Sequence, residues 1–354
     1  MRRFTLKILL ALVPIALMVA VNFTRDPAGL FGGGLEARIA ALLAEGHAVR
    51  VGGDYNARLV DRYYVQRAPH PPDVLVLGNS RAMRIRASAF PGRTLMNQAV
   101  FAATIEDFVA VVGMYDAAGR WPREVVLVLD PWLLNEFNGM NGWRSIASEY
   151  DYMSRRLGID PSGLLPTMRP ELDEYFALFS PAYFQAALRS RSSAEETRRV
   201  AAVPEAPAED AVILRDGSRL DGRAVRERSR ADVERNALSD IGPPIDGLEH
   251  FSALSARQER ELTLLTRYLV GRGIGVTFVL MPYHPLMRSV LDTRAAYAMV
   301  GKAEQRFRRL ARELGVPIRG SPDPAACGCS EPDFLDGIHP DASCSERALS
   351  VVQF

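Results

Sequence analysis

The sequence lacks an excess of charge of either sign. Its 43 Lys and Arg residues nearly balance 42 Asp and Glu residues, which leaves a formal net charge of +1 over 354 residues. A balanced surface has no overall field that would gather nucleic acid or an acidic polymer, so the composition argues against nucleic-acid binding. No internal repeat is present, and a hydrophobic content of 48% is sufficient for one large α/β core. One main domain is the simplest prediction.

Metal-binding motifs are also scarce. The only cysteines are Cys327, Cys329 and Cys344, which lack the Cys-x-x-Cys spacing of a zinc site, and His339 is the only histidine near them. The chain has none of the repeated Asp and His motifs that a metal-dependent phosphoesterase needs at its strand ends. We therefore predict no metal and no nucleotide cofactor. In an oxidising compartment, one of the first two cysteines is expected to pair with Cys344 and clamp the segment that carries His339, with free thiols as the alternative.

Long uncharged hydrophobic runs are absent except near the N-terminus, at residues 8–21, with apolar character extending to Phe23. At ~16 apolar residues, this run is slightly short for a membrane span and slightly long for the core of a signal peptide. No clear cleavage site follows it, so an uncleaved anchor is preferred to a signal peptide. Because Arg2, Arg3 and Lys7 precede the run, the positive-inside rule predicts a cytoplasmic N-terminus and a periplasmic or extracytoplasmic main domain.

The pattern of hydrophobic residues predicts an α/β fold with a doubly wound parallel sheet. Continuous apolar runs alternate with segments of helical periodicity, which is typical of parallel strands covered on both faces. The expected strands are residues 73–77, 93–97, 124–129, 275–280 and 316–318, and the expected helices are residues 56–68, 104–118, 254–271 and 294–314.

Residues 136–250 interrupt this pattern and are interpreted as a mostly helical insertion. The periodicity weakens there, and residues 190–235 are dense in Arg, Glu, Ala and Ser. Within the insertion, residues 212–220 contain a central Asp216-Gly217 pair, which predicts a small β-hairpin.

Two motifs carry the predicted chemistry. Gly78-Asn79-Ser80 follows the first expected strand, and Asp336 precedes His339 by three residues near the C-terminus. Each motif alone is common as a helix cap or a structural turn. Together they supply a hydroxyl at a strand end, an imidazole that takes its proton and a carboxylate that orients the imidazole. The sequence therefore predicts a serine hydrolase, although not one with the Gly-x-Ser-x-Gly elbow, because position 82 is Ala.

These motifs resemble those of the SGNH (GDSL-like) hydrolase superfamily. Gly78-Asn79-Ser80-Arg81 is similar to the Gly-x-Ser-Arg variant of the first block, found in membrane-anchored members that work beside polysaccharide or teichoic-acid acylation systems. Residues 22–31 are also similar to the membrane-proximal Asp-Pro segment of those members. The resemblance covers residues 1–31, 73–135 and 274–345. It implies an anchor and a membrane-proximal segment in residues 1–31, followed by a domain with a three-layer, flavodoxin-like sheet in residues 32–354. The resemblance does not explain the insertion.

The resemblance implies that Ser80 is the nucleophile, His339 the general base and Asp336 the residue that orients His339. The sequence departs from the family in its second and third blocks, where the usual glycine and Gly-x-Asn-Asp are missing. The candidates for the oxyanion hole are therefore the Ser80 backbone N–H and the side chains of Asn97 and Asn135, with loop or turn hydrogen bonding as the alternative for the two asparagines.

Four further residues are candidates for substrate binding: Arg81, Asp130, Trp132 and His284. For three of these residues, a structural role is the alternative to substrate binding. Arg81 is as well suited to a salt bridge with a local carboxylate, Trp132 to core packing, and His284 to a satisfied position in its loop. His284 is also an alternative to His339 as the base.

The implied function is a serine-dependent acyl-ester transferase or esterase outside the cytoplasm. By the resemblance, the chemistry is O-acetylation of a cell-envelope or exported polysaccharide. The expected partners are an acylated glycan or acyl donor and a membrane-bound O-acyltransferase. The alternative is a non-catalytic glycan-binding or accessory protein with the same fold, which the two altered blocks favour.

Overall fold

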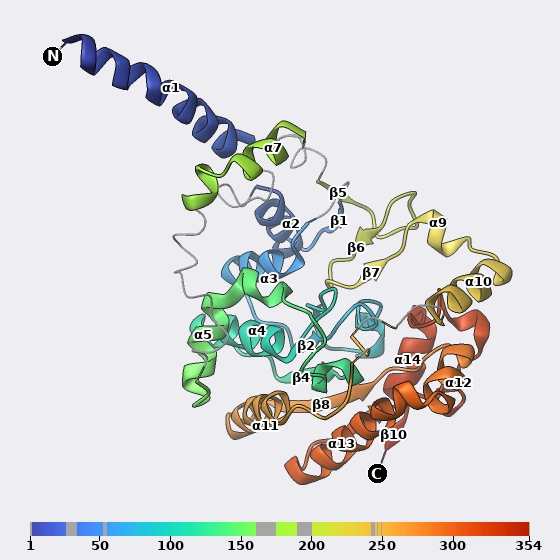
Figure 1. The fold of residues 1–354 in the computed structure, drawn as a ribbon. Helices are drawn as coiled ribbons and strands as arrows, with labels where there is room; N and C mark the ends of the chain where they lie inside the picture. Colours follow the sequence, from blue (N-terminus) through green and yellow to red (C-terminus); the bar gives the residue numbers. More distant parts are fainter. Residues whose placement is uncertain are drawn as a thin grey trace.

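The computed structural model describes residues 2–25, 34–51, 55–160, 175–189, 200–241, 245, 247–248 and 250–353. Its centre is a six-stranded sheet in the order β10-β9-β8-β4-β2-β3 (Figure 1). The strands are β2 (Val74–Leu77), β3 (Leu95–Asn97), β4 (Glu124–Val128), β8 (Gly275–Leu280), β9 (Ile318–Gly320) and β10 (Val352–Gln353). All neighbouring pairs are parallel except β10 with β9.

The five parallel strands confirm the predicted doubly wound sheet. In chain order they are arranged 2-1-3-4-5, because β2 lies between β3 and β4. The direction of winding therefore reverses between β2 and β4. Ligands of open α/β sheets bind at such a reversal, beyond the carboxyl ends of the strands.

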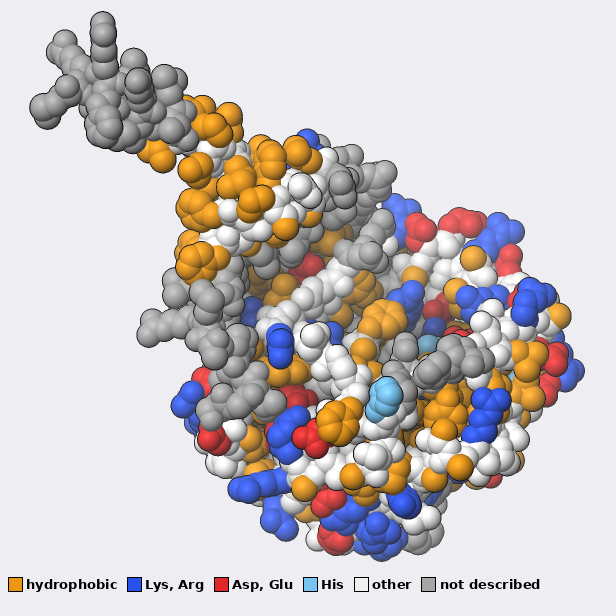
Figure 2. Space-filling view, in the orientation of Figure 1, with side chains coloured by type: hydrophobic (Ala, Val, Ile, Leu, Met, Phe, Trp, Pro, Cys, Tyr) orange, Lys and Arg blue, Asp and Glu red, His pale blue; other side chains and the backbone are white. Residues whose placement is uncertain are grey.

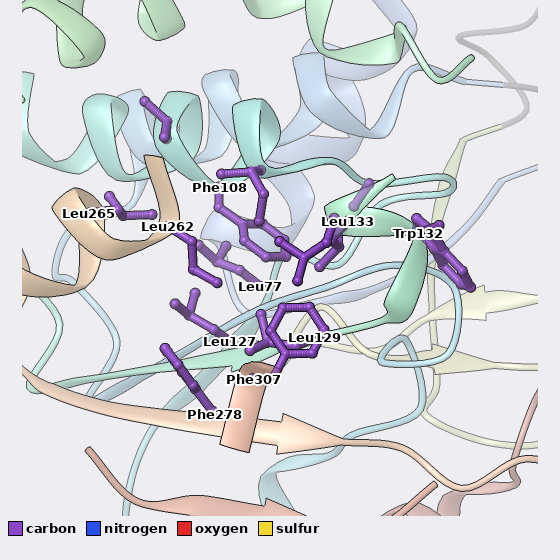
Figure 3. Close-up of a cluster of buried hydrophobic side chains, with 14 of the residues drawn as sticks. Leu77, Phe108, Leu127, Leu129, Trp132, Leu133, Leu262, Leu265, Phe278 and Phe307 are labelled. Carbon is purple, nitrogen blue, oxygen red and sulfur yellow. The ribbon is translucent and has the colours of Figure 1, made fainter. Parts of the chain in front are cut away.

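Helices cover both faces of this sheet, which gives three layers. Side chains alternate along each strand, so that Leu75 and Leu77 pack on one face while Val74 and Val76 pack on the other. The first face is covered by α4 (Ile105–Ala117), α11 (Ala256–Gly271) and α13 (Ala298–Leu314), and the second by α14 (Ala342–Ser350). Figure 3 shows the first face, where Phe108, Leu262 and Phe307 meet the strand residues.

The predicted helices form close to their expected positions, with capping that the sequence supports. In α3 (Ala57–Arg67), the Asn56 side chain accepts a hydrogen bond from the Arg58 backbone N–H at 3.1 Å. Thr104 and Asp107 form a capping box at the start of α4. The four helices expected from periodicity are therefore confirmed, although α13 starts at Ala298, after a 3-10 turn at Ala295–Tyr297.

The insertion differs from the mostly helical unit that was predicted. Its described residues form α5 (Ala147–Arg156), α7 (Pro181–Arg189), α9 (Arg223–Arg226) and α10 (Arg230–Ile241), but also three strands: β5 (Ala201–Val203), β6 (Val212–Ile213) and β7 (Arg219–Leu220). The predicted hairpin is confirmed, since β6 pairs with β7 in antiparallel register.

These three strands join a segment from the start of the chain. β1 (Ala48–Arg50), which the sequence pattern did not reveal, lies between β5 and β6 in a second, antiparallel sheet. Helix α2 (Gly34–Ala44) packs beside it, and α5 packs on α4 against the main core. The insertion thus packs against the main core through α5 and pairs with the N-terminal strand β1 through β5 and β6.

The chain begins with a helix that extends away from the domain, α1 (Arg2–Arg25), which contacts α7 near its C-terminal end (Figure 1). It contains the predicted membrane span, residues 8–21. Among the described residues, however, no helix is both long enough and apolar enough to cross a membrane. The predicted Asp-Pro motif, residues 26–27, lies outside the described residues.

Candidate active site

Ser80 lies just beyond β2, on the side of the sheet reversal. Gly78 makes the tight approach possible, because a Cβ atom there would lie 2.6 Å from the Ala82 Cβ and 2.9 Å from the Val128 Cβ. The chain then turns sharply, with the Ala82 N–H donating to the Asn79 carbonyl at 2.9 Å. The segment after Gly78 forms a turn, followed by a 3-10 helix at Ala87–Ala89.

The structure brings Ser80, His339 and Asp336 together although more than 250 residues separate the first two. Ser80 Oγ lies 2.8 Å from His339 Nε2, and His339 Nδ1 lies 2.8 Å from Asp336 Oδ2. The side chains of His339 and Asp336 are 20% and 23% exposed, so both remain in contact with solvent. This is the geometry of a nucleophile, a base and an orienting carboxylate.

Backbone groups of the same loop hold the Asp336 carboxylate in this position. Its Oδ1 accepts the backbone N–H groups of Ile338 at 3.0 Å and His339 at 2.8 Å. Burial raises the pKa of Asp336, but the His339 ring and these N–H groups outweigh burial and lower the pKa to about 2. The carboxylate is therefore charged at neutral pH, and it favours the His339 tautomer with a proton on Nδ1 and a lone pair on Nε2 toward Ser80.

A disulfide closes the loop that carries Asp336 and His339. Cys329 pairs with Cys344, 15 residues later, so the predicted clamp is present and its first partner is Cys329. Cys327 is a buried free cysteine whose thiol faces the Ser321 carbonyl at 3.4 Å. The clamp limits the positions that His339 can take.

The insertion supports the same loop from outside. The Gly337 N–H donates to the Asp240 carboxylate at 3.0 Å, and the Arg228 guanidinium donates to the Leu335 carbonyl at 3.0 Å. Burial raises the pKa of Asp240, and the Gly337 N–H opposes that shift. These residues were missed at the sequence level, because no local motif marks a side chain that contacts a loop about 100 positions away.

Arg81 and Asp130 form a buried ion pair instead of an open substrate site. The Arg81 guanidinium is fully enclosed: besides Asp130, it donates to the carbonyls of Met281, Pro282 and Ile338 at 2.6–3.0 Å. Arg81 therefore ties the turn that carries Ser80 to the ends of β4 and β8 and to the loop that carries His339. This is the alternative predicted for Arg81, and neither residue is free to meet a substrate.

Trp132 and His284 are buried as well. Trp132 belongs to the large core cluster and packs near Leu133 (Figure 3). His284 caps α12 (Pro285–Thr293), with its Nδ1 accepting the Leu286 N–H at 3.2 Å. Burial lowers the pKa of His284 and keeps the ring neutral. Its backbone N–H donates to the Gly337 carbonyl at 3.1 Å, so His284 positions the loop, while His339 is the histidine in contact with Ser80.

The three predicted oxyanion donors differ in whether they already have a hydrogen-bond acceptor. Both amide hydrogens of Asn97 are occupied by the carbonyls of Ala82 and Ile85, at 2.8 and 2.9 Å. The Asn135 amide donates to the Gly247 carbonyl at 2.8 Å. By contrast, none of the described residues accepts a hydrogen bond from the Ser80 N–H. The Ser80 N–H is thus an available donor, and the two asparagines hold the backbone in place.

A pocket of about 330 Å³ is lined in part by residues close in the chain to the turn that carries Ser80, although Ser80, Asp336 and His339 are not among its lining residues. Its walls include Met83, three residues after Ser80, and Phe101, which is 52% exposed. The Val100 N–H donates to the Gly78 carbonyl at 3.0 Å, which places this wall close to the turn. The hairpin of the insertion supplies Arg219, whose guanidinium lies 5.7 Å from the centroid of the Phe101 ring.

Across the described part of the chain, no group of three or more His, Cys, Asp or Glu side chains is placed to hold a metal ion. Comparison of the chain with models of known protein families, with curated proteins and with solved structures gave no match. The functional interpretation therefore depends on the geometry of the site itself.

Proposed function

We propose that the protein is a serine-dependent acyl-ester transferase or esterase that acts outside the cytoplasm. The observation that supports this most directly is the contact of Ser80 Oγ with His339 Nε2, at 2.8 Å, together with the contact of His339 Nδ1 with Asp336. A hydroxyl paired with an oriented imidazole at a strand end is the arrangement that acyl transfer requires.

In the proposed reaction, His339 Nε2 takes the proton of Ser80 as Oγ attacks the carbonyl carbon of an acyl ester. The Ser80 N–H donates to the oxyanion of the tetrahedral intermediate. When the intermediate collapses, the ester C–O bond breaks, His339 returns the proton to the leaving alcohol, and an acyl ester remains on Ser80. Water or a sugar hydroxyl, deprotonated by His339, then attacks that ester. The bond between the acyl carbon and Ser80 Oγ breaks, His339 returns the proton to Oγ, and the free acid or the acylated sugar leaves. Asp336 stays ionised throughout and stabilises the imidazolium.

The proposed substrates are acylated glycans, with acetyl as the acyl group, and the proposed partner is a membrane-bound O-acyltransferase. These follow from the resemblance to anchored SGNH-type members. The pocket lined by Met83 offers the exposed aromatic ring of Phe101 beside Arg219, whose guanidinium also pairs with Asp221 at 3.4 Å, and this aromatic and polar lining suits a sugar ring. The Cys329–Cys344 disulfide supports an oxidising compartment, as expected for a domain that α1 attaches to the outer face of a membrane.

The decisive experiment is turnover of p-nitrophenyl acetate and labelling by a fluorophosphonate probe. We expect the wild type to react and both Ser80→Ala and His339→Ala to lose turnover and labelling. Ser88→Ala is the matched control, because Ser88 is an exposed serine eight residues away that contacts Glu346. Equal labelling of the wild type and the Ser80→Ala protein would refute the proposal.

One observation favours a second candidate, the non-catalytic glycan-binding or accessory protein. The backbone N–H groups of Gln98, Ala99 and Val100, where the family's second donor is expected, are all occupied by other acceptors. An unreactive wild type that still binds an acetylated glycan, with the same affinity after Ser80→Ala, would establish this second function.

A further inference from the structure

The exposed hydrophobic side chains of the protein are concentrated in one region. Among the described residues, 15 large hydrophobic side chains are exposed, and nine of them lie on α1 or in residues 175–189. They are Leu12, Val13, Ile15, Leu17, Phe23, Tyr175, Phe176, Phe179 and Leu188. Figure 2 shows hydrophobic side chains gathered where α1 meets α7, whereas on the rest of that face they are mixed with charged side chains. A patch of this kind marks an interaction surface.

The two segments are joined as one unit. The Asn22 side chain is fully buried and its amide nitrogen lies 2.8 Å from the Leu178 carbonyl and 3.3 Å from those of Ala177 and Ser180. A buried amide with several backbone partners fixes one segment against the other, because leaving these groups unpaired is costly. The apolar side chains of residues 175–189 therefore continue the apolar surface of α1.

The chemistry of the surface indicates its partner. Neither residues 2–25 nor residues 175–189 contain Asp or Glu, whereas Arg25 is exposed at the end of α1. Tyr175, Phe176 and Phe179 place three exposed aromatic rings where α1 meets the domain. Aromatic side chains are enriched at the boundary between lipid and water, and helices with apolar and basic residues but no acidic ones bind anionic bilayers.

We propose that α1 and residues 175–189 together form a docking surface for a lipid bilayer that contains anionic lipids. In this arrangement the segment from the insertion lies in the headgroup region as a second contact beside α1. The surface would hold the domain close to the membrane in one orientation, which goes beyond attachment by an N-terminal helix alone. The inference is independent of the chemistry at Ser80.

The test uses the full-length protein with vesicles of phosphatidylcholine and phosphatidylglycerol, without other proteins. We expect the double variant Phe176→Asp/Phe179→Asp to lower the partition coefficient in a flotation assay by about tenfold or more, because two buried rings are lost from the lipid. Phe137→Asp is the matched control, since Phe137 is 64% exposed but lies outside the patch, and it should float like the wild type. Partition should also fall at high salt and in vesicles of phosphatidylcholine alone.

Hydrogen exchange of the wild type provides a second measurement that needs no variant. Vesicles should protect the amides of residues 175–189. No protection, together with unchanged flotation of the double variant, would overturn the proposal, and protection only when a membrane protein is added would assign the surface to a protein partner. Equal partition into neutral and anionic vesicles would refute the requirement for anionic lipid. A thermal melt of each variant shows whether it is folded, and fluorophosphonate labelling, read separately, reports only on the proposed activity.

Discussion

The candidate site has two parts: the contacts among Ser80, His339 and Asp336, called the acid–base half, and the donors near Ser80 that would bind an oxyanion, called the anion-binding half. The two halves differ in how many of their groups are available. In the acid–base half, His339 contacts both Ser80 and Asp336 at 2.8 Å, and a disulfide closes the loop that carries the histidine. In the anion-binding half, the Ser80 N–H is available, but the backbone groups after β3 and the Asn97 amide already have partners. The groups for proton transfer are therefore in place, whereas a second oxyanion donor requires a rearrangement or a contribution from the substrate.

The largest expected effect comes from removing the acid–base half. Ser80→Ala and His339→Ala should each lower kcat/KM by about 10³-fold or more, and Asp336→Asn by a similar factor because it favours the wrong tautomer of His339. The measurement is p-nitrophenyl acetate turnover, with thermal melts to show that each variant is folded. A loss of less than about tenfold in all three would mean that the three residues do not act as a unit.

The next effect comes from the residue that connects the two halves. Arg81→Met leaves the Asp130 carboxylate buried without its charge partner, so it should destabilise the protein by about 3–5 kcal/mol. Arg155→Met is the control, since Arg155 is 68% exposed in its pair with Asp151 and its loss should change the stability little. Urea unfolding measures both. Equal stability of the two variants would show that the buried pair does not hold the site together.

Opening the loop of the acid–base half should have a slightly smaller effect. Cys344→Ser removes a disulfide that spans 15 residues and should cost about 3 kcal/mol of stability. Activity should fall as well, because His339 becomes free to leave Ser80. The control is Cys327→Ala, which preserves the disulfide. If the two variants lose activity equally, the clamp is not what positions the histidine.

A substitution of Asn97, in the anion-binding half, tests whether this residue supports the backbone or takes part in catalysis. Asn97→Ala leaves the carbonyls of Ala82 and Ile85 without their donor, so we expect a loss of about 2 kcal/mol of stability and little change in kcat for the folded protein. The experiment measures the melting temperature and kcat on one preparation. A drop in kcat of about 10²-fold at an unchanged melting temperature would instead identify Asn97 as an oxyanion donor.

The smallest effect concerns the pH dependence of the Asp336 contacts. The pKa of Asp336 is about 2 in the folded chain, against 3.8 for an unperturbed aspartate, so the ionised form is favoured on folding. This contribution, about 2 kcal/mol, is fully present above pH 4 and is lost as the pH falls toward 2. The difference in unfolding free energy between the wild type and Asp336→Asn should therefore shrink from pH 5 to pH 2. A constant difference would contradict the lowered pKa.

Much of the architecture is predictable from the sequence because it depends on local patterns. Short continuous apolar runs rich in β-branched residues, such as residues 124–129, predict buried strands, and the periodicity of residues 104–118 predicts a helix. The pair Asp216-Gly217 marks its hairpin, since Gly217 has a φ of 78° that glycine adopts without strain. The candidate triad is predictable for the same reason: Asp336 and His339 are neighbours in the chain, and Ser80 follows a strand whose end must face them.

Other features depend on contacts between distant residues, which no local pattern encodes. Arg81 is equally suited by its chemistry to a substrate or to a carboxylate, and only the fold placed Asp130 beside it. Likewise, Cys327 and Cys329 are alternatives until the backbone brings one of them within reach of Cys344.

The sequence alone thus determined the parallel sheet, its main helices and the members of the candidate triad, because hydrophobic periodicity and short motifs act over a few positions. The tertiary structure decided which polar groups are available. It buried Trp132 and His284, occupied the amide of Asn97, and brought Asp240 from the insertion to the loop of His339. Such pairings follow from packing across the whole chain, where each buried polar group must find a partner wherever the fold provides one.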